Sequence, residues 1–484
     1  MLKYDKNHFL LILYRFNLHI KKLIMETFRT SSYFIPVKLD NELNKYVIVQ
    51  GYTGAFDVIS SEIHSFLRAT PSFKKGDFPF STETFERLKK RGYITSLSKE
   101  KEYNFAHKLA YLLHEKAKKL SKNFMFLVSY DCNFRCPYCF ENCISQNGHQ
   151  WSKKMFSTTM VDRAYKAMLQ IEKEKKLHLK NIMLYGGEPL LYENKEIVSY
   201  IIEQGINKGY VFSAVTNGYD LNHFAEVLSP EKLHHLQITI DGTKELHNQR
   251  RFHYEKGNSF DIIMDNISLA LQKEVQLSVR INADKKTLEH IEDLITEFKA
   301  RGFIKNTNFK YYITPLTNYE DNENQSNAEI EYTDRKGIQK QVKEKEYGFE
   351  CSDYGTSTRI LQAIKNKKPL QLRSIFCAAQ SSEYIFDPYG NIYNCWNFVG
   401  KPSQIIGNYR NDKILWTSKK EDWHNRNIST SPNCKHCRYA FFCGGGCLAH
   451  ASQKNGKFDI SHCNNYPSMF KHAVNKAYSQ YIKY

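Results

Sequence analysis

The 484-residue sequence lacks a hydrophobic run long enough to cross a membrane as a helix. Such a helix needs about 20 consecutive apolar residues, and the most apolar early segment, FLLILY at 9–14, ends at Arg15. No small-residue cleavage site follows it, so we do not expect a secretory signal peptide. We therefore expect a cytoplasmic chain without a membrane contact, in which residues 1–24 are an optional extension before Met25.

The sequence also lacks a repeat in which basic and aromatic residues alternate, although Tyr (32) and Phe (31) are abundant. Lysine and arginine together number 69 against 51 acidic residues, which gives a formal net charge of +18. This excess is spread along the chain. The excess positive charge is consistent with a soluble surface, or with an acidic peptide or an anionic redox protein as a partner. We expect no nucleic-acid partner.

Twelve cysteines are present, and nearly all of them are clustered. In a cytoplasmic chain, cysteines favour metals or catalysis over disulfides. Cys132, Cys136 and Cys139 are spaced C-x3-C-x2-C. Disulfides between such close neighbours are geometrically awkward, and zinc prefers four ligands in separated pairs. An iron–sulfur cluster accepts this spacing, and with three cysteines it leaves one iron open; a fourth ligand from Cys143 would instead make an electron carrier.

Six short apolar runs alternate with helical stretches from residue 124 onward. This alternation is typical of a parallel sheet with right-handed crossovers. We therefore predict an α/β fold with a partial, open (β/α)6 barrel of the TIM type. The apolar runs are at 124–130, 181–185, 210–215, 236–240, 276–280 and 309–313, and the helical stretches are at 158–175, 193–207, 260–273 and 286–301.

Polar or glycine-rich sequence directly follows each of the first five predicted strands. In parallel barrels the carboxyl ends of the strands form the active-site rim, so these segments should meet there. Two adjacent glycines also permit close backbone approach. We expect a pocket for a polar cofactor with an amine and a sugar. The segments are Cys132, Gly186-Gly187-Glu188, Thr216-Asn217-Gly218, Asp241-Gly242 and Asn282.

Outside this region the pattern changes at both ends. Residues 33–59 indicate two β-runs with a Gly-containing turn, which are followed by helices at 61–69 and 82–94, and together they predict a small α+β unit. A basic amphipathic helix at 99–122 would connect it to the barrel. Residues 318–350 resemble an exposed linker. The remainder is rich in cysteine, with little long regular structure expected, and is typical of a domain organised by metal.

Seven cysteines near the C-terminus are too many for a single zinc ion and suit two clusters, although Cys434 and Cys437 taken alone would also suit zinc. Cys377 and Cys395 form a C-x12-G-x4-C pattern. It is followed by C-x2-C-x5-C-x3-C at 434, 437, 443 and 447, and then by Cys463.

The set C-x3-C-x-Y-C, GGEP, TNG and ITIDG…HNQR resembles the radical S-adenosylmethionine (SAM) superfamily. The resemblance implies that Cys132, Cys136 and Cys139 bind a [4Fe–4S] cluster whose open iron chelates SAM. One-electron reduction would then give methionine and a 5′-deoxyadenosyl radical, and Cys143 would be a bystander. The implied SAM contacts are Tyr138 at the adenine, Gly186, Gly187 and Glu188 at the methionine amine, and Thr216, Asn217, Asp241 and Arg280 at the ribose or carboxylate. No catalytic residue of the protein itself is assigned.

The C-terminal pattern resembles the SPASM extension of this superfamily, which carries two auxiliary [4Fe–4S] clusters. The resemblance implies Cys377, Cys395 and Cys447 as ligands of the first, with Cys351 as a tentative fourth. Cys434, Cys437, Cys443 and Cys463 would then hold the second. The electron donor would be a flavodoxin or a ferredoxin-type protein.

The N-terminal unit resembles the PqqD-like winged-helix module that grips the leader of a ribosomal precursor peptide by strand addition; a plain structural cap on the barrel is the alternative. We therefore predict an oxidoreductase that modifies such a peptide by hydrogen abstraction, forming a thioether or other cross-link. An anaerobic sulfatase maturase is the alternative enzyme, but that family places Asp where Trp396 stands. A multi-cluster electron carrier would have no use for GGEP and TNG. The predicted domains are 1–24 (extension), 25–98 (PqqD-like), 99–123 (linker helix), 124–317 (radical SAM barrel), 318–350 (linker) and 351–484 (SPASM).

Overall fold

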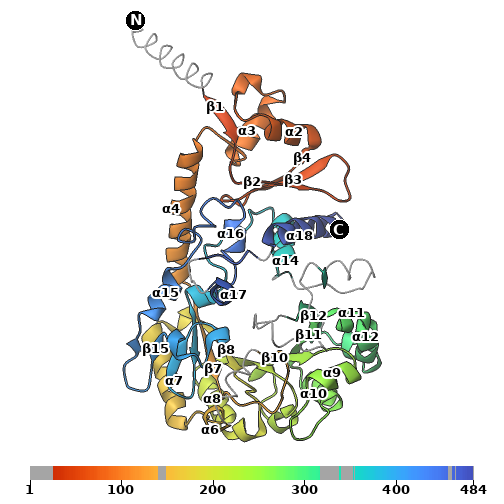
Figure 1. Cartoon of the computed structure of the whole chain (residues 1–484), viewed down its shortest axis with the longest axis vertical. Coiled ribbons are helices and arrows are strands. Elements are labelled where there is room, and N and C mark those ends of the chain that lie inside the picture. The colour runs from red at the N-terminus through yellow and green to blue at the C-terminus, as the bar shows by residue number, and fades with distance from the viewer. Residues whose placement is uncertain are drawn as a thin grey trace, which may run out of the picture.

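The computed structural model describes residues 26–139, 149–316, 337–338, 353, 355–455, 460–463 and 465–482. Within them, no helix combines the length and apolar character needed to cross a membrane. In Figure 1 the N-terminal unit lies at one end of an elongated molecule and the central sheet lies at the other. Helix α4 (Lys99–Lys118) runs between them, and the C-terminal domain fills the space beside it.

The six predicted parallel strands are present, which confirms the α/β fold class. Each pairs in parallel with the next strand in sequence. They begin and end close to the predicted bounds, because each contains a short apolar run that contributes buried side chains to the core. The strands are β7 (Lys122–Leu127), β8 (His178–Tyr185), β9 (Val211–Thr216), β10 (Leu233–Ile240), β11 (Gln276–Ala283) and β12 (Phe309–Pro315).

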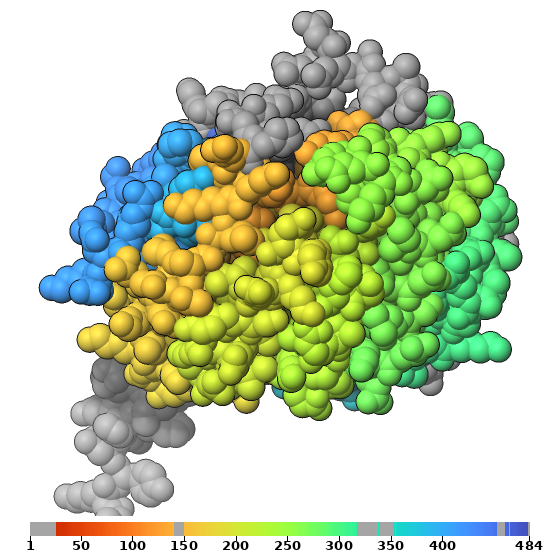
Figure 2. Space-filling view, turned by 90° about the horizontal axis from the view of Figure 1, so that it is seen from below, coloured from red at the N-terminus to blue at the C-terminus, as the bar shows by residue number. Residues whose placement is uncertain are grey.

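Helices on the outer face of this sheet complete the core. Figure 2 shows their yellow and green residues as a continuous surface seen from below. The stretch predicted as one helix at 286–301 is divided in two at His290. The helices are α7 (Thr158–Ile171), α8 (Lys195–Ile206), α9 (Lys244–Arg250), α10 (Phe260–Gln272), α11 (Lys285–Glu289) and α12 (Ile291–Ala300).

The C-terminal domain extends the same sheet instead of forming a separate layer. Strand β13 (Glu383–Phe386) pairs in parallel with β7, and the antiparallel strands β14 (Asn391–Tyr393), β15 (Gly407–Asn408) and β16 (Leu415–Trp416) follow. The resulting ten-stranded sheet has the order β12-β11-β10-β9-β8-β7-β13-β14-β15-β16. The cysteine-bearing segments 377–395 therefore attach directly to the edge of the barrel.

The N-terminal unit contains three antiparallel strands where two β-runs were predicted, and that prediction was wrong. The second run is broken at residues 51–55, where the chain turns back on itself. A smaller sheet, β5-β1-β6, lies beside it. The strands are β1 (Thr27–Thr30), β2 (Phe34–Lys38), β3 (Lys45–Gln50), β4 (Phe56–Ser60), β5 (Phe73–Lys74) and β6 (Ile94–Thr95), and the helices are α2 (Ser61–Ala69) and α3 (Thr82–Lys90).

Both faces of the central strand β3 are buried from Val47 to Gln50, but by different parts of the chain. Ile48 faces Phe85 and Leu88 of α3. Val47 and Val49 face α14 (Thr356–Lys365) and α18 (Tyr466–Tyr481). These two helices lie in a region expected to have little long regular structure, so that expectation was wrong. Their apolar faces join the N-terminal unit to the C-terminal domain.

A buried ion pair holds α9 against the end of β11. Arg250 donates to both carboxylate oxygens of Asp284, at 3.2 and 2.6 Å, and the two side chains are 1% and 0% exposed. Thr287 also donates to Asp284. Removing one partner of such a pair leaves an uncompensated buried charge.

We expect Arg250→Met to lower the free energy of unfolding by about 3–5 kcal/mol. Denaturant unfolding of the purified protein measures it. Lys176→Met, at the exposed pair with Glu174, serves as the control and should change it by less than about 1 kcal/mol. An Arg250→Met effect no larger than this control would contradict the structural role of the pair.

Candidate active site and cysteine clusters

Cys132, Cys136 and Cys139 follow β7 at the carboxyl edge of the sheet, as predicted. The pKa of the Cys132 thiol is raised well above its usual value by burial, and then by the charges of Glu188, Cys136 and Cys139. The three thiols therefore lie within electrostatic reach of one another. Asn217 Nδ2 is 4.0 Å from Cys132 Sγ, and Arg251 Nη1 is 3.6 Å from Cys136 Sγ.

Gly186 and Gly187 allow the loop after β8 to lie against the backbone that leads into Cys132. Gly186 has a φ of +145°, and a Cβ there would meet Ser129 O at 2.3 Å. A Cβ on Gly187 would meet Asp131 O at 2.3 Å. The amide of Gly187 donates to Ser129 O at 3.1 Å, and that of Glu188 donates to Asp131 O at 2.7 Å. Side chains at either glycine would push these two loops apart.

The Glu188 carboxyl connects the loops after β8 and β9. It accepts hydrogen bonds from Leu190 N at 2.8 Å, Thr216 Oγ1 at 2.6 Å and Asn217 N at 2.5 Å. Burial raises its pKa to about 7, and these hydrogen bonds oppose the shift. The structure thus brings Glu188, Thr216 and Asn217 together, as the sequence predicted.

Tyr138 is the centre of a second polar group, formed from the ends of β10 and β11. Its hydroxyl donates to Asp241 Oδ2 and accepts from Asn282 Nδ2 at 3.3 Å. Arg280 Nε donates to Asn282 at 2.9 Å. Arg251, which the sequence analysis missed, also donates to the Tyr138 hydroxyl, at 3.1 Å. Arg251 is the last residue of HNQRR and directly follows α9. Its contacts therefore depend on where the end of that helix lies in the fold.

The chemistry of this site fits a polar, partly charged ligand beside a metal cluster. Asp241 Oδ1 and Arg251 Nε are buried and have no hydrogen-bond partner within the described part of the chain. Buried polar atoms normally have partners, so each such atom calls for an explanation. Three adjacent thiols, an acceptor and a cationic donor on one rim match the groups that SAM and an iron–sulfur cluster require.

The seven described C-terminal cysteines fall into two electrostatic groups. The pKa of Cys395 is raised well above its usual value by burial, then by Cys377, with a smaller contribution from Cys447. The pKa of Cys443 is raised to about 12 by burial, with contributions from Cys434 and Cys463. Cys437 interacts with Cys434 and Cys463 as well. The groups match the two predicted ligand sets, whose role as ligands stays a prediction.

Gly444, Gly445 and Gly446 explain how two neighbouring cysteines enter different groups. All three have positive φ angles, between 73° and 88°. A Cβ at Gly444 would meet Ile375 O at 2.2 Å, and one at Gly446 would meet His462 O at 1.8 Å. Only glycine adopts such a run without strain. The turn sends Cys443 toward one group and Cys447 toward the other.

Across the described ranges no group of three or more His, Cys, Asp or Glu is placed to hold a single metal ion. All ten cysteines in those ranges carry thiols rather than disulfides. Cys143 and Cys351 lie outside the described residues.

Two buried charged residues beside these cysteines were missed in the sequence because no motif marks them. The Arg426 side chain interacts with Cys434 and Cys443 of one group and with Cys377 and Cys447 of the other. Its Nε and Nη1 have no hydrogen-bond partner in the described structure. Glu383, at the start of β13, is 7% exposed, and burial raises its pKa to about 7.

Comparison with known proteins agrees with this geometry. Residues 126–324 match the family model described as the radical SAM superfamily. The chain is 23% identical over 361 residues to a cysteine-type anaerobic sulfatase-maturating enzyme of Clostridium novyi, covering 72% of this chain and 94% of that protein. It is 21% identical over 374 residues to the radical SAM cyclopropyl synthase TigE of Paramaledivibacter caminithermalis, covering 73% and 74%.

A solved structure shows the same fold. Native anSMEcpe with bound AdoMet and Cp18Cys peptide superposes with a TM-score of 0.55 at 18% identity, over 75% of this chain and 100% of that one. Residues 126–324 therefore match the radical SAM family model and share the fold of that structure, with the cysteine rim and the GGEP loop at the carboxyl edge of the sheet.

We expect Gly187→Ala to disturb the rim, because the added methyl group would meet the Asp131 carbonyl next to Cys132. Iron bound per chain and 5′-deoxyadenosine released from SAM should both fall, the latter by about tenfold or more. Gly76→Ala is the control, since a Cβ there meets nothing within 4 Å. Iron content and SAM cleavage equal to those of the Gly76→Ala protein would contradict the proposed close approach.

Proposed function

We propose that Cys132, Cys136 and Cys139 hold a [4Fe–4S] cluster and that SAM binds beside it on the rim. The observation that carries this proposal is the convergence of three neighbouring thiols, the Gly-Gly-Glu loop and the unsatisfied Asp241 and Arg251 atoms. When bound, this cofactor pair would supply a 5′-deoxyadenosyl radical for hydrogen abstraction from a peptide.

The chain's own residues would bind and orient this cofactor. Glu188 fixes the relative positions of the loops after β7, β8 and β9 through its hydrogen bonds. Tyr138 and Asp241 present a buried hydroxyl and carboxyl toward the space beside Cys136. Arg251 places a positive charge next to that thiol, which favours the thiolate that a metal requires.

The two cysteine groups support a further part of the proposal, two auxiliary clusters in the C-terminal domain. Cys377, Cys395 and Cys447 would hold the first, and Cys434, Cys437, Cys443 and Cys463 the second. Arg426 lies between the groups, and its positive charge would offset part of the negative charge of both. His450 bonds to Cys447 and lowers the pKa of that thiol against the opposing effect of burial.

The proposed substrate is a ribosomally made precursor peptide, modified by an oxidative cross-link such as a thioether. TigE, a radical SAM cyclopropyl synthase, is similar over most of this chain, and anSMEcpe was solved with a peptide bound. The N-terminal unit supports a peptide substrate too, because β4 is a terminal strand of its sheet in the described structure. An extended leader could add to this edge.

A sulfatase maturase is the alternative function, and the likeness to the Clostridium novyi enzyme over 94% of its length favours it. The residue after Cys395 counts against it. Trp396 stands there, 39% exposed, where the resemblance implies an acidic residue. Glu383 supplies a buried carboxyl near Cys395, but it lies on β13 and not at the position after that cysteine.

Three cysteine variants test the division of roles. Cys136→Ala should abolish 5′-deoxyadenosine release, because it removes a ligand of the SAM-binding cluster. Cys443→Ala should retain release but stop modification of the proposed precursor peptide. Chromatography of the nucleoside and mass spectrometry of the peptide measure the two steps.

Cys143→Ala is the matched control and should retain both activities. Loss of SAM cleavage in that variant would show that Cys143 is a ligand. Full peptide modification by the Cys443→Ala enzyme would contradict the role proposed for the second cysteine group.

A further inference from the structure

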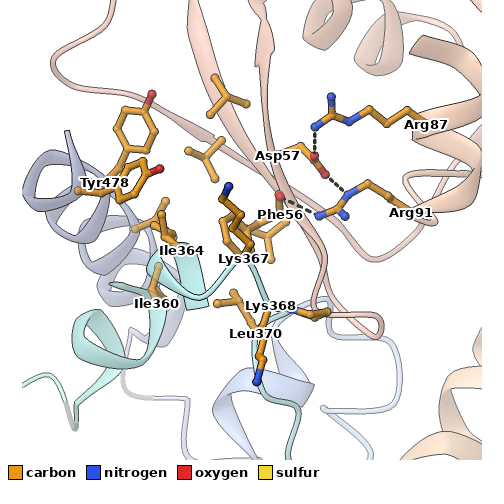
Figure 3. Close-up of a pocket in the computed structure, with 16 residues that line it drawn as sticks. Phe56, Asp57, Arg87, Arg91, Ile360, Ile364, Lys367, Lys368, Leu370 and Tyr478 are labelled. Carbon is orange, nitrogen blue, oxygen red and sulfur yellow. Dashed lines mark hydrogen bonds and ion pairs between the residues drawn. The ribbon is translucent and has the colours of Figure 1, made fainter. Parts of the chain in front are cut away.

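A cavity of about 460 Å³ lies between β4 and the two helices of the C-terminal domain. Figure 3 shows Phe56 and Asp57 of β4 on one side and Ile360, Ile364 and Tyr478 on the other. The cavity floor is apolar, formed by Val47, Val49, Ile360, Ile364 and Val474. Two separate domains therefore build its walls.

Within the described structure β4 is a terminal strand of its sheet, and its outer edge borders this cavity. On that edge Arg91 Nη2 already donates to Phe56 O, at 2.9 Å. Gln50 N donates to Ala55 O at 2.8 Å. Because bonded and non-bonded pairs alternate in antiparallel sheets, Asp57 should bond back to β3, and Val58 should present its N–H and C=O outward. Val58 is 44% exposed. An exposed edge of this kind is a template for an additional strand.

The charges around the cavity are mainly positive. Asp57 is neutralised by Arg87, 2.8 Å away, and by Arg91. Lys367 and Lys368 approach from the opposite wall, after α14. Neither lysine forms an ion pair within the described residues. A strand lying here would meet a cationic surface on each side.

Lys367 occupies a position that normally favours glycine. Its φ is +51°, and its amide donates to Ile364 O at 3.1 Å as the helix ends. Glycine or asparagine is usual in this conformation. The backbone of Lys367 is therefore anchored to the end of α14, and its side chain lines the cavity.

A second cavity of about 400 Å³ lies on the other face of β4, lined by Ile63, Thr84, Arg87 and Leu88 among others. Side chains of a strand alternate between its two faces. A strand added to β4 would therefore direct alternate side chains toward α3 and toward the wall formed by α14 and α18.

We propose that the precursor peptide adds to β4 as an extended, acidic segment, and that the C-terminal domain forms half of its binding groove. Lys367 and Lys368 receive acidic side chains on the face that points toward α14 and α18. This inference rests on the proposed peptide-modifying function. Helix α18 would link the bound segment to the cysteines, because it begins shortly after Cys463 and its Tyr466 packs near Cys443.

The test uses the full-length, cluster-loaded enzyme and a phage-displayed library of random linear peptides. Selected peptides should carry Asp or Glu at alternate positions. A fluorescein-labelled peptide from this selection should bind about tenfold more weakly to the Lys367→Glu/Lys368→Glu variant. The Lys299→Glu/Lys471→Glu variant has the same change in net charge at two exposed lysines and should bind within about twofold of the parent.

Hydrogen–deuterium exchange of the parent enzyme provides a readout that does not depend on a variant folding. The bound peptide should protect both β4 and residues 365–370. Protection confined to β4, equal binding by the Lys367→Glu/Lys368→Glu variant, or a selection without acidic residues would each overturn the two-domain groove. Modification of the precursor by the parent enzyme is measured separately, so failure of the groove and failure of the proposed function are distinguishable.

Discussion

The hydrogen bonds of Glu188 are the interactions on which the candidate site depends most. The Glu188 amide donates to the Asp131 carbonyl just before Cys132, and the Glu188 side chain accepts hydrogen bonds from Leu190, Thr216 and Asn217. Three strand ends are thereby held in one arrangement. Burial makes this carboxyl costly when it is charged, as its pKa of about 7 shows, so its hydrogen bonds are needed to keep it in place.

Much of the barrel could be predicted because its strands are apolar runs whose order in the sequence is also their order in the sheet. The same parallel order predicts that Cys132, Glu188, Thr216 and Asp241 meet at one edge. A Gly-containing turn was expected within residues 33–59. The run KYVIVQGYTGAFDVI was still counted as one strand, because it carries strand-forming residues on both sides of that weak turn signal. The lengths of α14 and α18 were missed because their apolar faces match a sheet that is distant in sequence.

Arg251 and Arg426 show why the rest of the site was not accessible to sequence reasoning. Neither belongs to a recognised spacing, and each matters only through the thiols that the fold brings to it. The two C-terminal cysteine groups are the opposite case. Their members are marked by spacing, and the Gly444–Gly446 turn provides the physical means by which Cys443 and Cys447 separate.

The N-terminal unit and the cysteine domain are packed into one body. The β2-β3-β4 sheet buries one face on α3 and the other on α14 and α18. A peptide held at β4 would therefore contact a domain that is continuous with the barrel sheet through β13. This arrangement would place the proposed recognition edge and the proposed cluster ligands on one packed body.

Mass spectrometry of the precursor peptide after anaerobic incubation with the enzyme, SAM and a reductant tests the central claim most directly. The account predicts a peptide that has lost hydrogen through a new internal bond, with 5′-deoxyadenosine released in proportion. An unchanged precursor, together with conversion of a sulfatase-derived cysteine peptide to formylglycine, would contradict it.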